Sequence, residues 1–185
     1  QVARLAGTAE VNLADSQFNA DELTALGYAN VRVLPLVLDF HRLAETPDRR
    51  VGRRFRDGKV NVLFVGRVAP NKKIEDALAA FFVFNRCVEP ESRFIQVGSF
   101  AGAERYYYLL LTQVKEFGGA VHFAGSVPQA QLNAYYACAD VFLCMSEHEG
   151  FCIPIMESMA HDVPVLAYAA AAVPETMDGA GVLFR

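Results

Sequence analysis

The chain has 185 residues, 53% of them hydrophobic, and a net charge of −4. This composition supports a well-buried domain and excludes disorder, and the negative balance supplies no general attraction for nucleic acid or anionic lipid. No apolar run reaches the roughly 20 residues of a membrane span. The four scattered cysteines are typical of reduced thiols in a cytosolic protein. Since the chain starts on Gln and ends on an apolar run, we expect it to be cut at both ends.

Residues 1–39 are predicted to form a strand–helix–strand unit, with extended segments at 11–14 and 31–38 and a helix capped by Ser16. Residues 40–58 follow, with Pro47, two glycines and a run of five arginines. This composition is typical of a solvated basic linker between two structural units. The alternative is a basic strip that contacts an acidic acceptor or a membrane.

From residue 59 onward, short apolar segments alternate with segments of helical periodicity. Repeated strand–helix units with apolar strands predict an α/β fold: a doubly wound, mostly parallel, Rossmann-like sheet covered on both faces. The strands are expected at 60–66, 94–98, 121–125, 141–145, 163–168 and 182–184, and the helices at 74–88, 103–117, 128–137, around Glu157 and near 174–177.

The most informative segment is 146–160, S-E-H-E-G-F-C-I-P-I-M-E-S-M-A. Pro154 suits the first turn of a helix, so the preceding main-chain N–H groups should point out of the helix mouth, which favours phosphate. Glu149 lies in the turn before this helix and Glu157 inside it. Two carboxylates beside a phosphate cradle suggest a ligand with both hydroxyls and phosphates, such as a nucleotide-sugar.

Glycines end several of the predicted strands, at the sheet edge where ligands of this fold class bind. Gly66 precedes Arg67 and Lys72, which are five residues apart across a proline turn and could reach one diphosphate. The alternative is that both are ordinary surface charges. His148 is interpreted as a loop residue, because no neighbour in the sequence orients it as a base.

Four segments in register identify a family resemblance: G-R-V-A-P-N-K-K, F-A-G-S-V-P, the 146–160 segment, and P-V-L-A-Y-A-A-A-A-V-P-E-T. They resemble the C-terminal, donor-binding half of retaining glycosyltransferases of family 4 (group 1), which have the two-domain GT-B fold. The resemblance covers residues 59–185. Residues 1–39 would then be a remnant of the N-terminal acceptor domain, 40–58 the linker, and 59–185 a donor domain truncated at its C-terminal end.

The resemblance also implies roles for individual residues. Arg67 and Lys72 would act on the donor diphosphate, Glu149 on hydroxyls of the transferred sugar. Glu157 would bind the ribose hydroxyls, since a carboxylate matches a vicinal diol. No metal or cofactor is expected. The donor pocket would be completed by Gly66, Gly98, Ser99, Val127, Gly150, Phe151, Cys152 and Ile153.

The sequence departs from the family pattern where glycine is usual. The four departures are Lys73 after the lysine, Cys152 in E-G-F-C, His161-Asp162, and Ala171-Ala172. Alanine costs little wherever φ stays negative, so we expect function to be kept. Glu175 is either a helix-start charge or part of the donor pocket.

The expected function is retaining transfer of a glycosyl group from a nucleoside-diphosphate sugar to a saccharide or lipid-linked acceptor, in polysaccharide or glycolipid assembly. We expect a cytoplasmic location, with peripheral contact at the inner membrane face as the alternative, and an inactive isolated chain. The alternatives are a non-catalytic nucleotide-binding module and a GT-B-fold nucleotide-sugar epimerase. A nicotinamide oxidoreductase is disfavoured because no G-x-G-x-x-G follows the first strand. The oligomeric state is left open.

Overall fold

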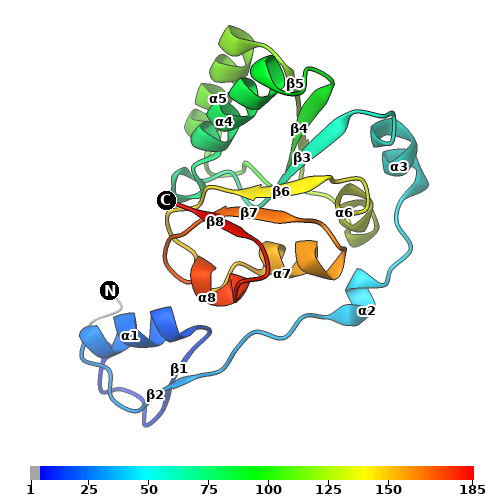
Figure 1. Cartoon of the computed structure of the whole chain (residues 1–185). Coiled ribbons are helices and arrows are strands. Elements are labelled where there is room, and N and C mark those ends of the chain that lie inside the picture. The colour runs from blue at the N-terminus through cyan, green and yellow to red at the C-terminus, as the bar shows by residue number, and fades with distance from the viewer. Residues whose placement is uncertain (1–4) are drawn as a thin grey trace.

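The computed structural model describes residues 5–185 and contains two structural units (Figure 1). The smaller one pairs two parallel strands, β1 (Asn12–Ala14) and β2 (Val31–Val33), around helix α1 (Gln17–Ala25). Ser16 caps α1 as predicted, because its side chain accepts the N–H of Asn19 at 3.1 Å. The extended segment after β2 leaves the sheet earlier than expected, since β1 offers only three partner residues.

The larger unit is a six-stranded sheet in which every pair of neighbours is parallel. Its order is β5-β4-β3-β6-β7-β8, which becomes 3-2-1-4-5-6 when β3 is counted first. That is the doubly wound order of dinucleotide-binding folds, so the predicted fold class is confirmed. The strands are β3 (Val60–Val65), β4 (Ser92–Val97), β5 (Ala120–Gly125), β6 (Val141–Cys144), β7 (Val165–Tyr168) and β8 (Val182–Phe184).

Helices cover both faces of this sheet (Figure 1). Side chains alternate along β3, so Val62 and Phe64 enter one core while Leu63 enters the other. The first core lies under α4 (Ile74–Cys87) and α5 (Glu104–Phe117). The second lies under α6 (Gln129–Tyr136), α7 (Ile153–Ala160) and α8 (Val173–Met177). Among residues 5–185, no helix combines the length and apolarity that a membrane crossing requires.

The segment 40–58 differs from the solvated linker expected for it. It contains α2 (Phe40–Leu43) and α3 (Arg49–Phe55), and α3 buries Val51 and Phe55 in the second core. The Phe55 ring also stacks 4.9 Å below the guanidinium of Arg93. Val51 and Phe55 are four residues apart and therefore share one face of the helix, an apolar stripe that the surrounding arginines obscure in the sequence.

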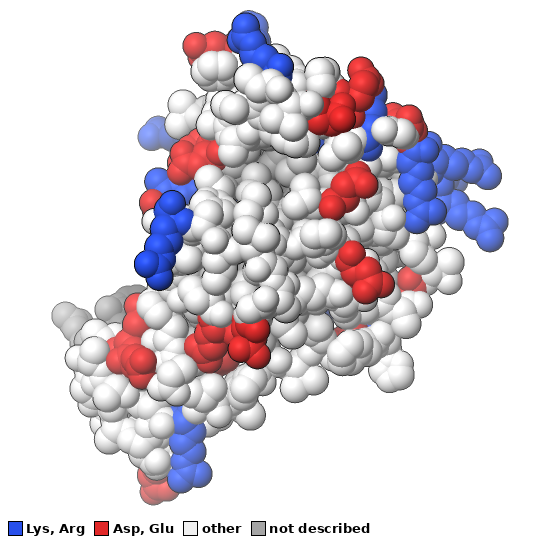
Figure 2. All heavy atoms as spheres, in the orientation of Figure 1, with Lys and Arg blue, Asp and Glu red and all other residues white. Residues whose placement is uncertain are grey.

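The arginines of α3 are exposed, as expected. Figure 2 shows basic side chains projecting together on the right of the molecule, where Figure 1 places α3. Asn133 of α6 donates its side-chain amide to the main-chain carbonyls of Arg42, Leu43 and Glu45 at 2.8–3.1 Å. These bonds fix the path of the chain between the two helices.

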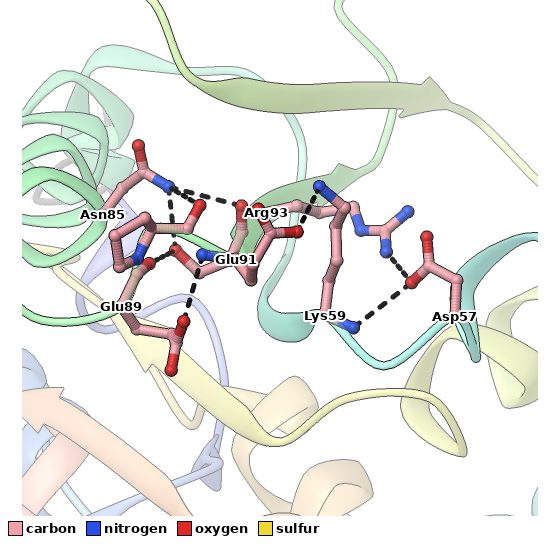
Figure 3. A network of polar contacts seen from close by, with 8 residues as sticks. Asp57, Lys59, Asn85, Glu89, Glu91 and Arg93 are labelled. Carbon is pink, nitrogen blue, oxygen red and sulfur yellow. Dashed lines mark hydrogen bonds and ion pairs between the residues drawn. The ribbon is translucent and has the colours of Figure 1, made fainter.

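A polar network closes the amino ends of β3 and β4 (Figure 3). Lys59 and Glu91 form an ion pair at 3.0 Å, and Arg93 pairs with Asp57. Asn85 donates to the carbonyl of Pro90 and to Ser92 Oγ, both at 3.0 Å. Ligands of this fold class bind at the opposite, carboxyl edge, so the network serves the fold.

Candidate functional site

The candidate site lies at the carboxyl edge of the sheet, next to the point where the strand order reverses between β3 and β6. Close packing of strand ends shapes this edge. Gly98 has φ 145°, and a Cβ added there would lie 2.0 Å from the carbonyl oxygen of Gly66. Only glycine fits that position. Gln96 Nε2 donates to the same carbonyl at 2.8 Å, which holds the two strand ends together.

At the centre of the site, Lys72 contacts Glu149. Lys72 lies in a single 3-10 turn, η2 (Pro70–Lys72), and its Nζ lies 2.6 and 2.7 Å from the two carboxylate oxygens of Glu149. The side chains are 21% and 10% exposed. A main-chain bond from the N–H of Glu147 to the carbonyl of Asn71, at 3.0 Å, joins the two loops beside the pair. The sequence predicted both residues but not their contact.

Beside this pair, the N-terminal end of α7 presents unpaired main-chain donors. Among residues 5–185, no group accepts a hydrogen bond from the N–H of Gly150, Phe151, Cys152 or Ile153. Pro154 occupies the first turn, and no side chain caps the helix. Such a helix end carries a partial positive charge and open donors, so it is suited to an anion.

Glu157 lies one turn further along α7 and lines a cavity. Its Oε2 accepts the hydroxyl of Tyr136 at 2.8 Å. Burial raises the pKa of Tyr136 well above its usual value, and the Glu157 charge adds to this effect, so the hydroxyl stays protonated. Tyr136 was missed in the sequence, because nothing marks it out among the helical tyrosines. The cavity beside Glu157 has a volume of about 160 Å³ and is lined also by Asp39, Arg42, Gln129 and Ile153.

The other predicted site residues lie at neighbouring strand ends. Arg67 is exposed directly after Gly66. The N–H of Val68 donates to the carbonyl of Ser99 at 2.9 Å, and the N–H of Gly98 to the carbonyl of Gly125 at 2.8 Å, two residues before the half-buried Val127. The structure thus brings Lys72 and Glu149 into contact and places the glycine-rich ends beside them. The individual roles stay predictions.

Backbone conformation distinguishes the positions where the sequence departs from the family pattern. Lys73, Cys152, Asp162 and Ala171 all have positive φ, between 48° and 66°. Glycine adopts this conformation freely, whereas other residues do so at a cost. Ala172 has φ −80°. The negative φ on which the expectation for alanine depends is therefore present at Ala172 and absent at Ala171.

Two buried thiols lie next to the Glu149 carboxylate. Cys144 ends β6 and Cys152 precedes α7, and they are 1% and 7% exposed. A hydrogen bond from Cys152, opposed by burial, lowers the pKa of the Cys144 thiol to about 7. The same bond and burial raise the pKa of Cys152.

The N-terminal unit contacts the loop that carries Glu149. A Cβ on Gly150 would lie 2.7 Å from Asn19 Nδ2 and 3.0 Å from Asp15 Oδ2. The Phe18 ring meets the His148 ring edge-on at 6.0 Å, which agrees with a loop role for His148. Asp15 and Asn19 were missed in the sequence. The available signal was that Asp15 follows a strand end, as the predicted site residues do.

Glu175 secures this contact. It lies in the first turn of α8, and its carboxylate accepts the main-chain N–H of Gln17 at 2.8 and 2.9 Å and that of Phe18 at 3.2 Å. Of the two interpretations of Glu175, the one that places it at the start of a helix is correct, because it lies in the first turn of α8. The N–H groups that its carboxylate accepts, however, belong to α1.

Comparison with known proteins identifies a family for most of the chain. Residues 46–183 match the family described as glycosyl transferases group 1. Relatives include a GDP-mannose-dependent alpha-mannosyltransferase of Mycobacterium tuberculosis, 32% identical over 86% of this chain and 39% of its own length. Another is the O-antigen chain mannosyltransferase B of Escherichia coli, 31% identical over 65% of this chain and 32% of its own length.

Solved structures share the fold. The Anabaena protein HepE in complex with UDP-glucose superposes with a TM-score of 0.85 at 21% identity, over 99% of this chain and 52% of that one. Sucrose-phosphate synthase from Thermosynechococcus elongatus gives 0.80 at 25% identity, over 98% of this chain and 46% of that one.

The fold and the family match therefore define the C-terminal domain of a GT-B-type protein. The chain belongs to the glycosyl transferases group 1 family. It spans between 26% and 46% of the length of the curated relatives it matches.

Proposed function

We propose that this chain binds a nucleoside-diphosphate sugar and forms the donor half of a retaining glycosyltransferase. The observation that carries the proposal is the Lys72–Glu149 contact at 2.6 Å beside the open helix mouth of α7. A cation, a carboxylate and free amides within one site match a ligand that carries phosphates and hydroxyls together.

The diphosphate is assigned to Arg67, Lys72 and the amides of 150–153. Two cations and a helix end can hold the negative charge that grows on the departing diphosphate. Because side chains and amides supply this charge, the proposed reaction needs no metal. Pairing with Glu149 keeps Lys72 oriented before the donor arrives.

The hydroxyl groups of the donor are assigned to the two glutamates. Glu149 accepts hydrogen bonds from the transferred sugar, and Glu157 accepts them from the ribose, with Tyr136 holding one of its oxygens. The base would lie against Gly98, Ser99 and the main chain of Val127. Relatives named as GDP-mannose-dependent and a fold neighbour containing UDP-glucose support a nucleotide-sugar donor without selecting its base.

Retention requires that the bond to the acceptor forms on the face from which the diphosphate leaves. The anomeric carbon–oxygen bond to phosphate breaks, and a bond to the acceptor oxygen forms. The acceptor proton passes to the departing phosphate oxygen. In this scheme the protein acts through electrostatics and positioning, with no covalent intermediate on the chain.

The acceptor is proposed to be a saccharide or a lipid-linked hydroxyl. Four free cysteines are typical of a reducing compartment, which supports work in the cytoplasm, at the inner membrane face where the acceptor is lipid-linked. Since the chain matches less than half of its curated relatives, we propose that it binds the donor but transfers sugar poorly by itself.

Calorimetry with the 185-residue chain tests the proposal. UDP, GDP, ADP and CMP are titrated first, followed by the sugar conjugate of the nucleotide that binds. We expect one nucleotide to bind and its conjugate to bind more tightly. If no nucleotide binds, the donor site is refuted. If the conjugate gains nothing over the nucleotide, the sugar role of Glu149 is refuted.

Two variants separate the proposed role of Lys72 in binding the diphosphate from that of Glu149 in binding the sugar. Lys72→Met should weaken both ligands by about 10-fold to 100-fold, the usual loss for a hydrogen bond to a charged group. Glu149→Gln should remove the gain from the sugar and spare the nucleotide. Lys59→Met is the matched control, because it breaks a lysine–glutamate pair at the opposite edge of the sheet.

A further inference from the structure

Three side chains that can bind a metal ion converge at the Lys72–Glu149 pair, and Glu149 is one of them. The sulfur atoms of Cys144 and Cys152 and a carboxylate oxygen of Glu149 all lie within 4.8 Å of one another. Their residues are 1%, 7% and 9% exposed, so the group is buried. Such convergence differs from the clusters of exposed acids that are common on protein surfaces.

The ligand chemistry selects the ion. Thiolate sulfur binds thiophilic ions, and zinc accepts sulfur together with carboxylate oxygen, at roughly 2.3 and 2.0–2.2 Å. Ligand atoms around one tetrahedral zinc are then roughly 3.3–3.8 Å apart. Small side-chain rotations would bring three atoms that lie within 4.8 Å of one another to that spacing. Hard ions such as magnesium prefer oxygen-only sites, which this cluster is not.

The charge balance favours an ion beside Lys72. With both thiols protonated, Glu149 and the Lys72 ammonium at 2.6 Å form a neutral group. A divalent ion that displaces two thiol protons adds two positive and two negative charges, so the cluster with Lys72 stays neutral. A buried site tolerates this exchange because no net charge is left uncompensated.

Two further observations point to the same place. Cys152 has φ 66°, a conformation that glycine would adopt at less cost. A residue kept under backbone strain suggests that its side chain is used. Ser146, two residues beyond Cys144, is fully buried, and beyond the Cys144 thiol its hydroxyl has no partner among the described residues.

We propose that Cys144, Cys152 and Glu149 form a binding site for a thiophilic divalent cation such as zinc, with Lys72 balancing the net negative charge of the ion and its three ligands. The fourth position is left to water or to the Ser146 hydroxyl. The ion takes the Glu149 carboxylate that the sugar would use, so it inhibits donor binding. This consequence rests on the proposed function, whereas the site itself does not.

Cobalt(II) is the probe, because thiolate ligands give it a charge-transfer absorption that zinc lacks. The reduced 185-residue chain is titrated with Co²⁺, and Zn²⁺ is then added. We expect one equivalent of cobalt to bind with that absorption and zinc to displace it. Cys144→Ser and Cys152→Gly should abolish the signal. Cys152→Gly also relieves the backbone strain, which offsets packing lost with the buried thiol. Cys87→Ser, at an exposed cysteine, is the matched control and should keep the signal.

The unsubstituted protein supplies an independent measurement. In partly denaturing urea, zinc should slow the alkylation of Cys144 and Cys152 at least tenfold and leave Cys87 unaffected. The site is refuted if cobalt gives no thiolate absorption, or if the absorption survives in the Cys144→Ser, Cys152→Gly double variant. It is equally refuted if the reduced protein binds no ion and mild oxidation merely joins the two thiols. If cobalt binds but leaves donor affinity unchanged, the metal site holds and the assigned role of Glu149 fails.

Discussion

The Glu175 carboxylate accepts the main-chain N–H of Gln17 at 2.8 and 2.9 Å, although 158 positions separate the two residues. Both oxygens bind the first turn of α1, where free N–H groups attract a negative charge. One side chain of α8 therefore acts as a cap for a helix of the other structural unit. The position of the N-terminal unit against the Glu149 loop depends on this contact.

Glu175→Gln should loosen the N-terminal unit while the six-stranded sheet stays folded. We expect the amide protons of α1 to exchange several-fold faster, equivalent to about 1 kcal/mol, as is typical for loss of a cap. Hydrogen exchange measures this effect residue by residue. Glu116→Gln, on the exposed side of α5, is the control. Unchanged exchange in α1 would show that the contact does not hold the unit.

Breaking the Lys72–Glu149 pair should destabilise the fold more than breaking an exposed pair. Lys72→Met leaves Glu149 largely buried without its cation, and we expect a loss of about 2 kcal/mol in the free energy of unfolding, below the 3–5 typical of fully buried pairs. Lys59→Met removes a pair whose side chains are 37% and 71% exposed, and should cost less than about 1 kcal/mol.

Urea unfolding of both variants checks this difference, and the Lys72→Met, Glu149→Gln double variant completes a cycle. Because the double variant leaves no unpaired charge, its loss should be smaller than the sum of the two single losses. Additive losses would mean that the two side chains do not interact in solution.

Ala171→Gly should stabilise the protein, although most alanine-to-glycine changes do the opposite. At φ 51° the alanine Cβ is strained, and its removal should gain roughly 0.5–1 kcal/mol after the added flexibility of the unfolded chain is subtracted. Ala172→Gly is the neighbouring control, since φ is −80° and the residue is fully buried. It should destabilise. Thermal unfolding checks both variants. If the midpoint temperatures of the two variants shifted in the same direction, the result would contradict the backbone geometry.

Stability should fall as the pH drops below about 6.5, the usual pKa of an unfolded histidine. Burial lowers the pKa of His161, against the opposing charges of Glu157 and Asp162. Burial also lowers the pKa of His122, and Arg54 and Arg93 add to the effect. The unfolded chain therefore binds more protons, and stability present above pH 6.5 is lost as the pH falls through the folded-state values.

Urea unfolding between pH 7.5 and 5.5 measures this loss. The double variant His122→Gln, His161→Gln should flatten the pH dependence, because neither side chain then titrates. His41→Gln, at an exposed position, is the matched control. An equally steep slope in the double variant would place the protonation elsewhere, for example on carboxylates.

The sequence by itself determined the order and type of the elements and the family of the chain. Apolar strand segments and helical periodicity are local properties, so the predicted strand at 60–66 and helix at 103–117 agree with the structure within one residue. The motif around Glu149 is also contiguous, and it identified the family without coordinates. The packing of α3 was missed because two apolar residues among five arginines give a weak pattern.

Only the tertiary structure decided which distant side chains meet. Lys72 and Glu149 are 77 positions apart, and no local pattern indicates that the turn after β3 faces the loop after β6. The positive φ of Ala171 likewise follows from the packing of its loop. Strand order and loop packing are set by the burial of apolar side chains across the whole sheet. Many residues contribute to this burial together, so no single segment of the sequence carries a pattern that predicts it.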